Sequence, residues 1–200
     1  ILALDAYCRD RYIELVPNQN SFGHMERWLI RKPYADLAEV PGGTKLAHGK
    51  MLLVKPEKFG TTLDPADARS LALIDGLYAE LLPHFSSGML NVGCDETWEL
   101  GQGKSRRACE ERGVGRVYLD YLLALHRLSE KHGRRMMFLG DIVMQHPELI
   151  AEIPHDVTAL EWGYERDHPF DIDTKAFRAA GLPYYVCPGS GSWISLIGRT

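Results

Sequence analysis

The chain has 200 residues, of which 45% are hydrophobic and 25% charged, a composition typical of one globular core. Its formal net charge of -4 provides no basic field, so we expect neither nucleic acid nor a membrane surface as a partner. No apolar run reaches the roughly 18 residues that a membrane-spanning helix needs.

The N-terminal segment, residues 1–12, is typical of the later turns of a helix. The chain begins with Ile1 and no signal-peptide pattern follows. We therefore interpret it as part of a longer protein, and expect a cytoplasmic location. The cysteines are scattered and form no C-x-x-C pair, which favours reduced thiols over disulfides or a zinc site. They are Cys8, Cys94, Cys109 and Cys187.

Along the rest of the chain, apolar runs alternate with helical patterns. The runs predict buried strands at 12–17, 89–94, 136–140, 157–162 and 183–187. A first long helix is expected to begin with Asp64 as N-cap and Pro65 at the first helical position. A second is expected over 117–132, ended by Gly133. Shorter helices are predicted from Pro147 and over 175–180, and the apolar stretch 51–54 is assigned to a long loop.

Strands that are apolar throughout and separated by helices indicate a parallel sheet. An open doubly wound sheet and a (β/α)8 TIM barrel both fit this pattern. No glycine-rich phosphate loop follows any strand, and polar and aromatic residues gather after the strands, which favours the barrel. A whole barrel takes about 250 residues. We therefore expect a single partial α/β barrel domain over 1–200, with roughly strands 3 to 7 and their helices.

Two neighbouring carboxylates, Asp95 and Glu96, directly follow the apolar run at 89–94. On a regular strand they would point to opposite faces, but alternation relaxes where a strand becomes a loop. Two carboxylates this close tend to raise one pKa, as a general acid requires. The alternative interpretation is that Asp95 caps a following helix and Glu96 lies in its first turn.

The segment NVGCDETWELG, which contains this pair, resembles the H-x-G-G-D-E strand of glycoside hydrolase family 20, the β-N-acetylhexosaminidases. The segment NQNSFGHMERW (18–28) resembles that family's P-E-x-D-x-P-G-H motif, with Gly23 and His24 in register. The C-terminal CPGSGSWISLIGRT (187–200) is similar to the C-P-G-[TS]-x-S-W segment of the hexosaminidase D-like branch. The resemblance covers essentially the whole chain.

The resemblance implies a hydrolase, a glycosidase that removes terminal N-acetylglucosamine or N-acetylgalactosamine from an amino-sugar glycoside or oligosaccharide. Family 20 uses substrate-assisted catalysis, in which the 2-acetamido group acts as the nucleophile. By position, Glu96 would be the general acid and base. Asp95 would accept the acetamido N–H and stabilise its positive charge. No cofactor and no metal are expected.

Other residues near the strand ends are expected to bind substrate, with a structural role as the alternative for each. A tryptophan after a strand could stack on a pyranose ring, and polar neighbours could bind hydroxyls. This set comprises His24, Asn20, Trp98, Asp141, Trp162, Tyr164 and Trp193. Glu161 is left out because it faces opposite to Trp162 on a regular strand. The histidines, including His48, His126 and His146, show no metal-ligand spacing.

The chain departs from the family pattern at several positions. Asn18 and Asn20 replace two acidic residues, and Leu139 stands where a pocket tryptophan is expected. The tyrosine that binds the acetamido oxygen has no clear counterpart. Ser190 lies near its place, and Tyr164 or Trp193 is the candidate substitute.

Two rival functions remain from the residues alone. One is a retaining glycosidase of the ordinary two-carboxylate kind, although 187–193 offers no nucleophilic carboxylate. The other is a non-catalytic carbohydrate-binding barrel segment. An incomplete barrel exposes apolar sheet edges, so self-association is expected.

Overall fold

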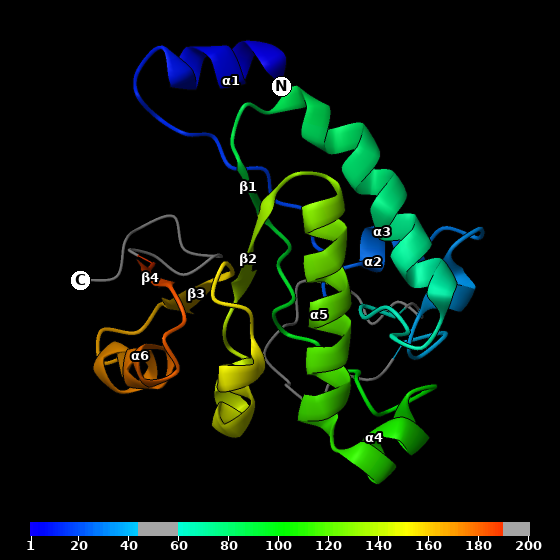
Figure 1. Cartoon of the computed structure of the whole chain (residues 1–200). Coiled ribbons are helices and arrows are strands. Elements are labelled where there is room, and N and C mark those ends of the chain that lie inside the picture. Colours follow the sequence, from blue (N-terminus) through cyan, green and yellow to red (C-terminus); the bar gives the residue numbers. More distant parts are fainter. Residues whose placement is uncertain (44–59, 190–200) are drawn as a thin grey trace.

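The computed structural model describes residues 1–43 and 60–189. Four parallel strands form one sheet in the order β1-β2-β3-β4 (Figure 1). They are β1 (Met89–Asn91), β2 (Arg135–Leu139), β3 (Thr158–Gly163) and β4 (Tyr184–Pro188). The strands expected at 136–140, 157–162 and 183–187 are confirmed to within one residue at each end, and the run at 89–94 forms a shorter strand than expected.

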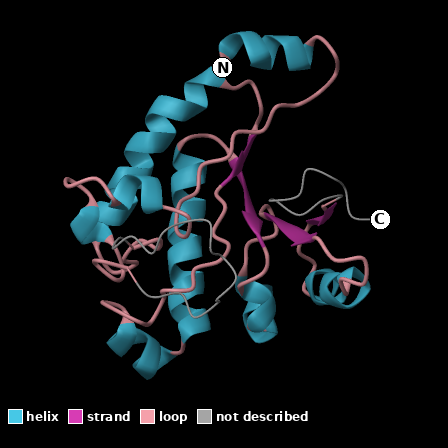
Figure 2. Cartoon of the chain, turned by 180° about the vertical axis from the view of Figure 1, so that it is seen from behind, coloured by secondary structure: helices cyan, strands magenta, loops and turns pink. Residues whose placement is uncertain are grey.

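Helices connect these strands and cover one face of the sheet. Between β1 and β2 lie α4 (Arg106–Arg112) and α5 (Val114–Lys131), and α6 (Phe170–Ala179) connects β3 to β4. Residues of β2 alternate between two apolar clusters. Met136 and Phe138 lie in the large core with α5, whereas Met137 packs with Met89 and Leu160 on the other face. A parallel sheet that is wrapped by crossover helices in this way is part of a (β/α)8 barrel, as expected (Figures 1 and 2).

The strand expected at 12–17 is wrong. Tyr12 adopts a left-handed conformation with φ 58°, and its side chain and that of Ile13 are exposed. Pairing with β1 begins only at Pro17, whose carbonyl accepts the Asn91 N–H, and Asn18 and Asn91 form an isolated parallel bridge. An apolar run predicts burial, but in the described chain Tyr12 and Ile13 are exposed, so the run does not form a buried strand.

The N-terminal helix is present as α1 (Leu2–Arg9), and α3 (Ala68–Leu81) is the first long helix. The N-cap of α3 is Asp67, not Asp64, because the Asp67 carboxylate accepts the Arg69 N–H. Asp64 instead accepts the Ala66 N–H within the preceding turn.

The remaining elements refine the expectations. Gly133, with φ 67°, follows α5, as expected. The segment from Pro147 is a 3-10 helix rather than an α-helix, and α6 begins five residues before the expected 175. Short elements that were not predicted are α2 (Glu26–Leu29), α4 and the 3-10 helices Ala35–Leu37 and Val143–Gln145, and the end of the first long helix forms the 3-10 helix Leu82–His84. The apolar stretch 51–54 lies outside the described residues.

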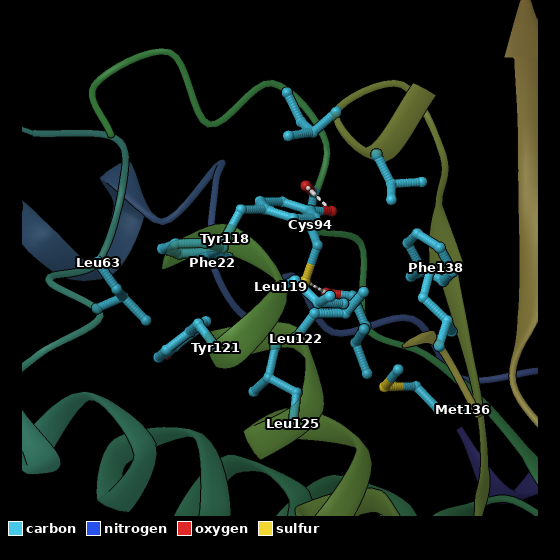
Figure 3. Close-up of a cluster of buried hydrophobic side chains, with 14 of the residues drawn as sticks. Phe22, Leu63, Cys94, Tyr118, Leu119, Tyr121, Leu122, Leu125, Met136 and Phe138 are labelled. Atoms are coloured by element: carbon cyan, nitrogen blue, oxygen red, sulfur yellow. Dashed lines mark hydrogen bonds between the residues drawn. The ribbon is translucent and has the colours of Figure 1, made fainter. Parts of the chain in front are cut away.

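The core beneath the strand ends is built on α5 (Figure 3). Leu119, Leu122 and Leu125 of this helix are fully buried. Phe22, from the loop before α2, packs against Tyr121 in a tilted arrangement with ring centroids 4.3 Å apart. The loops that follow Pro17 and β1 are therefore anchored on one helix. In the described part of the chain, no helix combines the length and apolarity needed to cross a membrane.

Candidate active site

The loop after β1 carries the acid pair in an unusual backbone conformation. Gly93, Cys94 and Glu96 have positive φ angles of 68°, 72° and 50°. Residues other than glycine rarely adopt this left-handed conformation. The strict alternation of side chains therefore ends at this loop. As a result, the carboxylates of Asp95 and Glu96 both reach the same imidazole, that of His24.

Two long-range hydrogen bonds hold this strained loop. The Tyr118 hydroxyl of α5 donates to the Cys94 carbonyl at 3.0 Å (Figure 3). The Glu96 N–H donates to Oδ2 of Asp141 at 3.1 Å. A left-handed non-glycine residue costs on the order of 1–3 kcal/mol, so such a loop persists only where surrounding contacts compensate. The first bond comes from α5, and the second is made to Asp141, which follows β2.

His24 lies between the two carboxylates. Its Nε2 is 3.3 Å from Oδ2 of Asp95 and 3.1 Å from Oε2 of Glu96. The close approach depends on Gly23, because a Cβ at that position would lie 2.3 Å from the Asp95 carbonyl oxygen. The glycine before His24 thus allows the loop after Pro17 to touch the loop after β1.

The two carboxylates change the charge of this histidine. Hydrogen bonds that the imidazole donates, to Asp95 first and to Glu96 second, raise the pKa of His24 to about 10, against the opposing effect of burial. The imidazole is therefore a cation at neutral pH. The three groups, which we call the acid–histidine cluster, hold a transferable proton and a positive charge directly beside both carboxylates.

Asp141 connects this cluster to the neighbouring strand ends. Burial raises the pKa of Asp141 to about 7, although the hydrogen bond from the Glu96 N–H opposes the shift. The negative charge of Asp95 raises this pKa further, whereas a second hydrogen bond, from Nε1 of Trp162 at 3.4 Å, lowers it. The carboxyl with a raised pKa at this site is thus that of Asp141, next to the acid pair.

An aromatic surface lies on the far side of Asp141. Trp162 and Tyr164 meet edge to face with ring centroids 5.7 Å apart. They line a cavity of about 350 Å³ together with Asp141. The acid–histidine cluster does not line this cavity. Asp141 connects the two regions, because it lines the cavity and also accepts the Glu96 N–H. The described chain therefore presents an acidic half and an aromatic half, joined at one carboxyl.

The other predicted substrate-binding residues lie at different depths. Trp98 is partly buried and meets the His24 ring edge to face at 6.3 Å. Asn20 packs under the acid-pair loop, where a Cβ on Gly93 would lie 2.5 Å from its Oδ1. Asn20 thus takes part in loop packing. Trp193 and Ser190 lie outside the described residues.

Among the residues that line the cavity, the motifs in the sequence did not point to Glu161, His168 or Asp173. Glu161 lines the same cavity as Trp162, together with His168. Its buried carboxyl was set aside because strand alternation alone predicts only a direction. The available signal in the sequence was His168, seven residues after Glu161 and just before α6.

Within the described residues, three groups bring histidine and carboxylate ligand atoms within 4.8 Å of one another. One is the acid–histidine cluster itself. The others are His126 with Glu130 and Asp156, and Glu161 with His168 and Asp173. Each group combines residues from separate elements, so no metal-ligand spacing along the sequence indicated it.

Comparison with known proteins gives one family. The catalytic-domain model of glycosyl hydrolase family 20 matches residues 1–188. Hexosaminidase D of Homo sapiens is 28% identical over 185 residues, which make up 86% of this chain and 34% of that protein. Hexosaminidase D of Bos taurus is 26% identical over 186 residues, or 86% of this chain and 49% of that protein. The chain thus spans between a third and a half of these relatives.

Solved structures share the fold at low identity. A chitobiase of Flavobacterium johnsoniae has a TM-score of 0.70 at 15% identity, and the match covers 94% of this chain and 28% of that structure. A β-N-acetylhexosaminidase of Bacteroides fragilis has a TM-score of 0.67 at 19% identity and covers 92%, which is 34% of that structure. These likenesses support the partial barrel.

Proposed function

Because the chain belongs to glycosyl hydrolase family 20, we propose that its protein hydrolyses terminal N-acetyl-β-D-hexosamine residues by a substrate-assisted, retaining mechanism. The observation that carries the proposal is the shared contact of Asp95 and Glu96 with His24 at the end of β1. Adjacent acids with side chains on the same side of a site suit a reaction in which each addresses a different atom of one sugar.

In the first step, the glycosidic oxygen takes a proton from Glu96 while the bond between that oxygen and the anomeric carbon breaks. The acetamido carbonyl oxygen of the substrate forms a new bond to the anomeric carbon, which yields an oxazolinium ion. The positive charge of this ion is shared with the acetamido nitrogen, whose N–H donates to Asp95. In the second step, Glu96 takes a proton from water while the water oxygen bonds to the anomeric carbon. The bond from that carbon to the acetamido carbonyl oxygen breaks, so the amide is restored and the anomeric configuration is retained.

The geometry favours this division of roles over the ordinary two-carboxylate mechanism. That mechanism places its carboxyl groups about 5 Å apart on opposite sides of the anomeric carbon. Here both carboxylates contact one Nε2 atom, at 3.3 and 3.1 Å, and so lie on the same side. In the described part of the chain, β4 carries no carboxylate that could serve as a separate nucleophile.

His24 is a positioning residue in this proposal. As a cation at neutral pH it keeps the two carboxylates side by side, and before the first step its Nε2 hydrogen can pass to Glu96, 3.1 Å away. The proton that Glu96 takes from water in the second step then restores the cluster.

Trp162 is proposed as the floor for the pyranose ring, with Asp141 holding its indole N–H. The same carboxylate accepts the Glu96 N–H, so the floor and the acid share one support. Tyr164 is proposed to border the sugar, and Trp98 to form the rim next to His24.

The acetamido mechanism predicts a strong requirement for the 2-acetamido group. We expect the naturally expressed protein to cleave nitrophenyl N-acetyl-β-D-glucosaminide or galactosaminide with a kcat/KM at least about 10²-fold above that for nitrophenyl β-D-glucoside, because an intramolecular nucleophile has a high effective concentration. A thiazoline analogue of the intermediate should inhibit competitively. Comparable hydrolysis of the plain glucoside, without inhibition by the thiazoline, would reject the mechanism.

A second candidate function is a non-catalytic, carbohydrate-binding barrel segment. It is favoured by large apolar side chains that remain exposed near both ends of the described chain. They are Leu2, Leu4, Tyr7, Tyr12, Ile13, Tyr185 and Val186. A surface of this kind is typical of a face that another part of a protein covers.

The exposed face predicts self-association of the 200-residue chain when it is produced alone. We expect light scattering to report dimers or larger species at micromolar concentration, because within the described residues no strand pairs with the outer edge of β4, where Tyr185 and Val186 are exposed. Replacing both residues with lysine should shift the population toward monomer, whereas Ile172→Lys on α6 is the matched control away from the sheet edge. A strictly monomeric chain over the same range would contradict this prediction.

A further inference from the structure

A second group of ionisable side chains lies on the helix side of β3, away from the acid pair. Glu161 belongs to β3, His168 to the loop before α6, and Asp173 to the first turns of α6. Nε2 of His168 is 3.3 Å from Oε1 of Glu161 and 3.6 Å from Oδ2 of Asp173. All three ligand atoms lie within 4.8 Å of one another.

Hydrogen bonding alone does not satisfy this group. An imidazole Nε2 carries at most one hydrogen, yet this one faces two carboxylates. The Glu161 side chain is only 5% exposed, and its buried Oε2 has no hydrogen-bond partner. Buried polar atoms in native proteins are nearly always paired, so an unpaired carboxylate oxygen requires an explanation.

The charges of these three side chains also favour a bound cation. Burial raises the pKa of Glu161, and the nearby charge of Asp173 raises it further, against the effect of His168. Two carboxylates thus compete for one imidazole in a poorly solvated place. A bound cation would offset the repulsion between the carboxylates of Glu161 and Asp173, and a Glu161 that binds through both oxygens would also pair its Oε2.

The group is also accessible to an ion from solvent. Glu161, His168 and Asp173 all line the cavity of about 350 Å³ that contains Trp162. This cavity has room for water as a further ligand. The His168 ring can lie against β3 because position 163 is glycine, where a Cβ would be 2.4 Å from its Cγ.

We propose that Glu161, His168 and Asp173 bind a divalent first-row transition-metal ion, with Zn²⁺ as the best match, and that cavity water completes its coordination. One imidazole and two carboxylate oxygens are common zinc ligands, with bond lengths of about 2.0–2.2 Å and tetrahedral geometry. Neighbouring ligands are then about 3.3 Å apart. The observed separations of 3.3 and 3.6 Å therefore require little movement.

Such an ion would tie the end of β3 to the start of α6. Trp162 follows Glu161 directly, so the ion would also fix the strand end that presents the aromatic surface. Its role is structural, and the acid–histidine cluster is not needed to bind it.

The test is binding of Co²⁺, followed by its visible absorption, and of Zn²⁺, followed by calorimetry and thermal unfolding. We expect one ion per chain and a higher Tm with Zn²⁺, because a ligand that binds only the folded state stabilises it. His168→Gln and Asp173→Asn should weaken binding at least about tenfold and abolish the Tm increase. Glu161→Gln should do the same if it folds, and Asp173→Asn, at a half-buried position, provides the result if it does not.

Two matched controls separate this site from the other histidine–carboxylate groups. His126→Gln and His24→Gln should each retain one ion with unchanged affinity and the same Co²⁺ spectrum. Loss of binding in either variant, with retention in His168→Gln, would overturn the proposal. So would the absence of any binding or Tm increase up to about 100 µM Zn²⁺.

Discussion

Replacing Glu96 with Gln should lower kcat/KM for an N-acetylglucosamine disaccharide by about 10²–10⁴-fold, the usual contribution of a general acid. Glutamine retains the shape of the side chain and its place beside His24, but it has no proton to give to the leaving oxygen. A nitrophenolate needs little protonation when it leaves. The loss of kcat/KM for the nitrophenyl glycoside should therefore be clearly smaller, and comparison of the two substrates isolates the acid role.

Glu110→Gln is the matched control for this variant, since Glu110 is exposed on α4, outside the site. It should leave both rates unchanged. Equal losses on the two substrates would assign Glu96 a role other than proton donation. Activity on the disaccharide within about twofold of the original would reject Glu96 as the acid, provided that thermal unfolding shows an intact fold.

Replacing Asp95 with Asn should lower kcat/KM for the N-acetyl substrate by about 10²-fold or more, as expected for a lost electrostatic contact to a charge that develops in the transition state. The asparagine oxygen can still accept the acetamido N–H, but it does not oppose the positive charge of the oxazolinium ion. The change should therefore weaken binding of the thiazoline analogue much more than binding of the product N-acetylhexosamine.

Asp10→Asn, an exposed substitution at the end of α1, is the control for that variant. An inhibition constant for the thiazoline that is unchanged in Asp95→Asn would show that Asp95 does not contact the acetamido group. Equal weakening of thiazoline and product would indicate a ground-state contact only.

The strands were the most predictable part of the fold. Apolar runs such as 157–162 are long enough to identify a buried parallel strand, and the structure has β3 over Thr158–Gly163. The run at 12–17 is similarly apolar but is not a strand. Burial depends on what lies opposite, and the described chain leaves Tyr12 and Ile13 without a covering layer.

Helix starts show a similar limit. Asp64 followed by Pro65 is a good N-terminal signal, and Asp67 three residues later is another. The chain uses the second, because Asp64 is buried in a turn and its carboxylate accepts the Ala66 N–H. Local preference permits both choices, and packing decides between them.

Short motifs identified the residues of the candidate site, but they did not predict how the side chains are arranged in space. The acid pair, Gly23 and His24 are visible as short patterns. That both carboxylates meet one imidazole depends on the left-handed backbone at Cys94 and Glu96, which adjacent elements hold in place. The raised pKa of Asp141 likewise comes from burial among groups on three strand ends.

Local periodicity and short motifs were enough to predict the four parallel strands, the long helices among them and the position of the acidic pair. Which side chains share an atom is set by tertiary packing. It brought His24 to the acid pair, and His168 and Asp173 to Glu161, across chain separations that periodicity cannot span. Contacts of that kind arise from how whole elements pack, so they become visible only when the chain is folded.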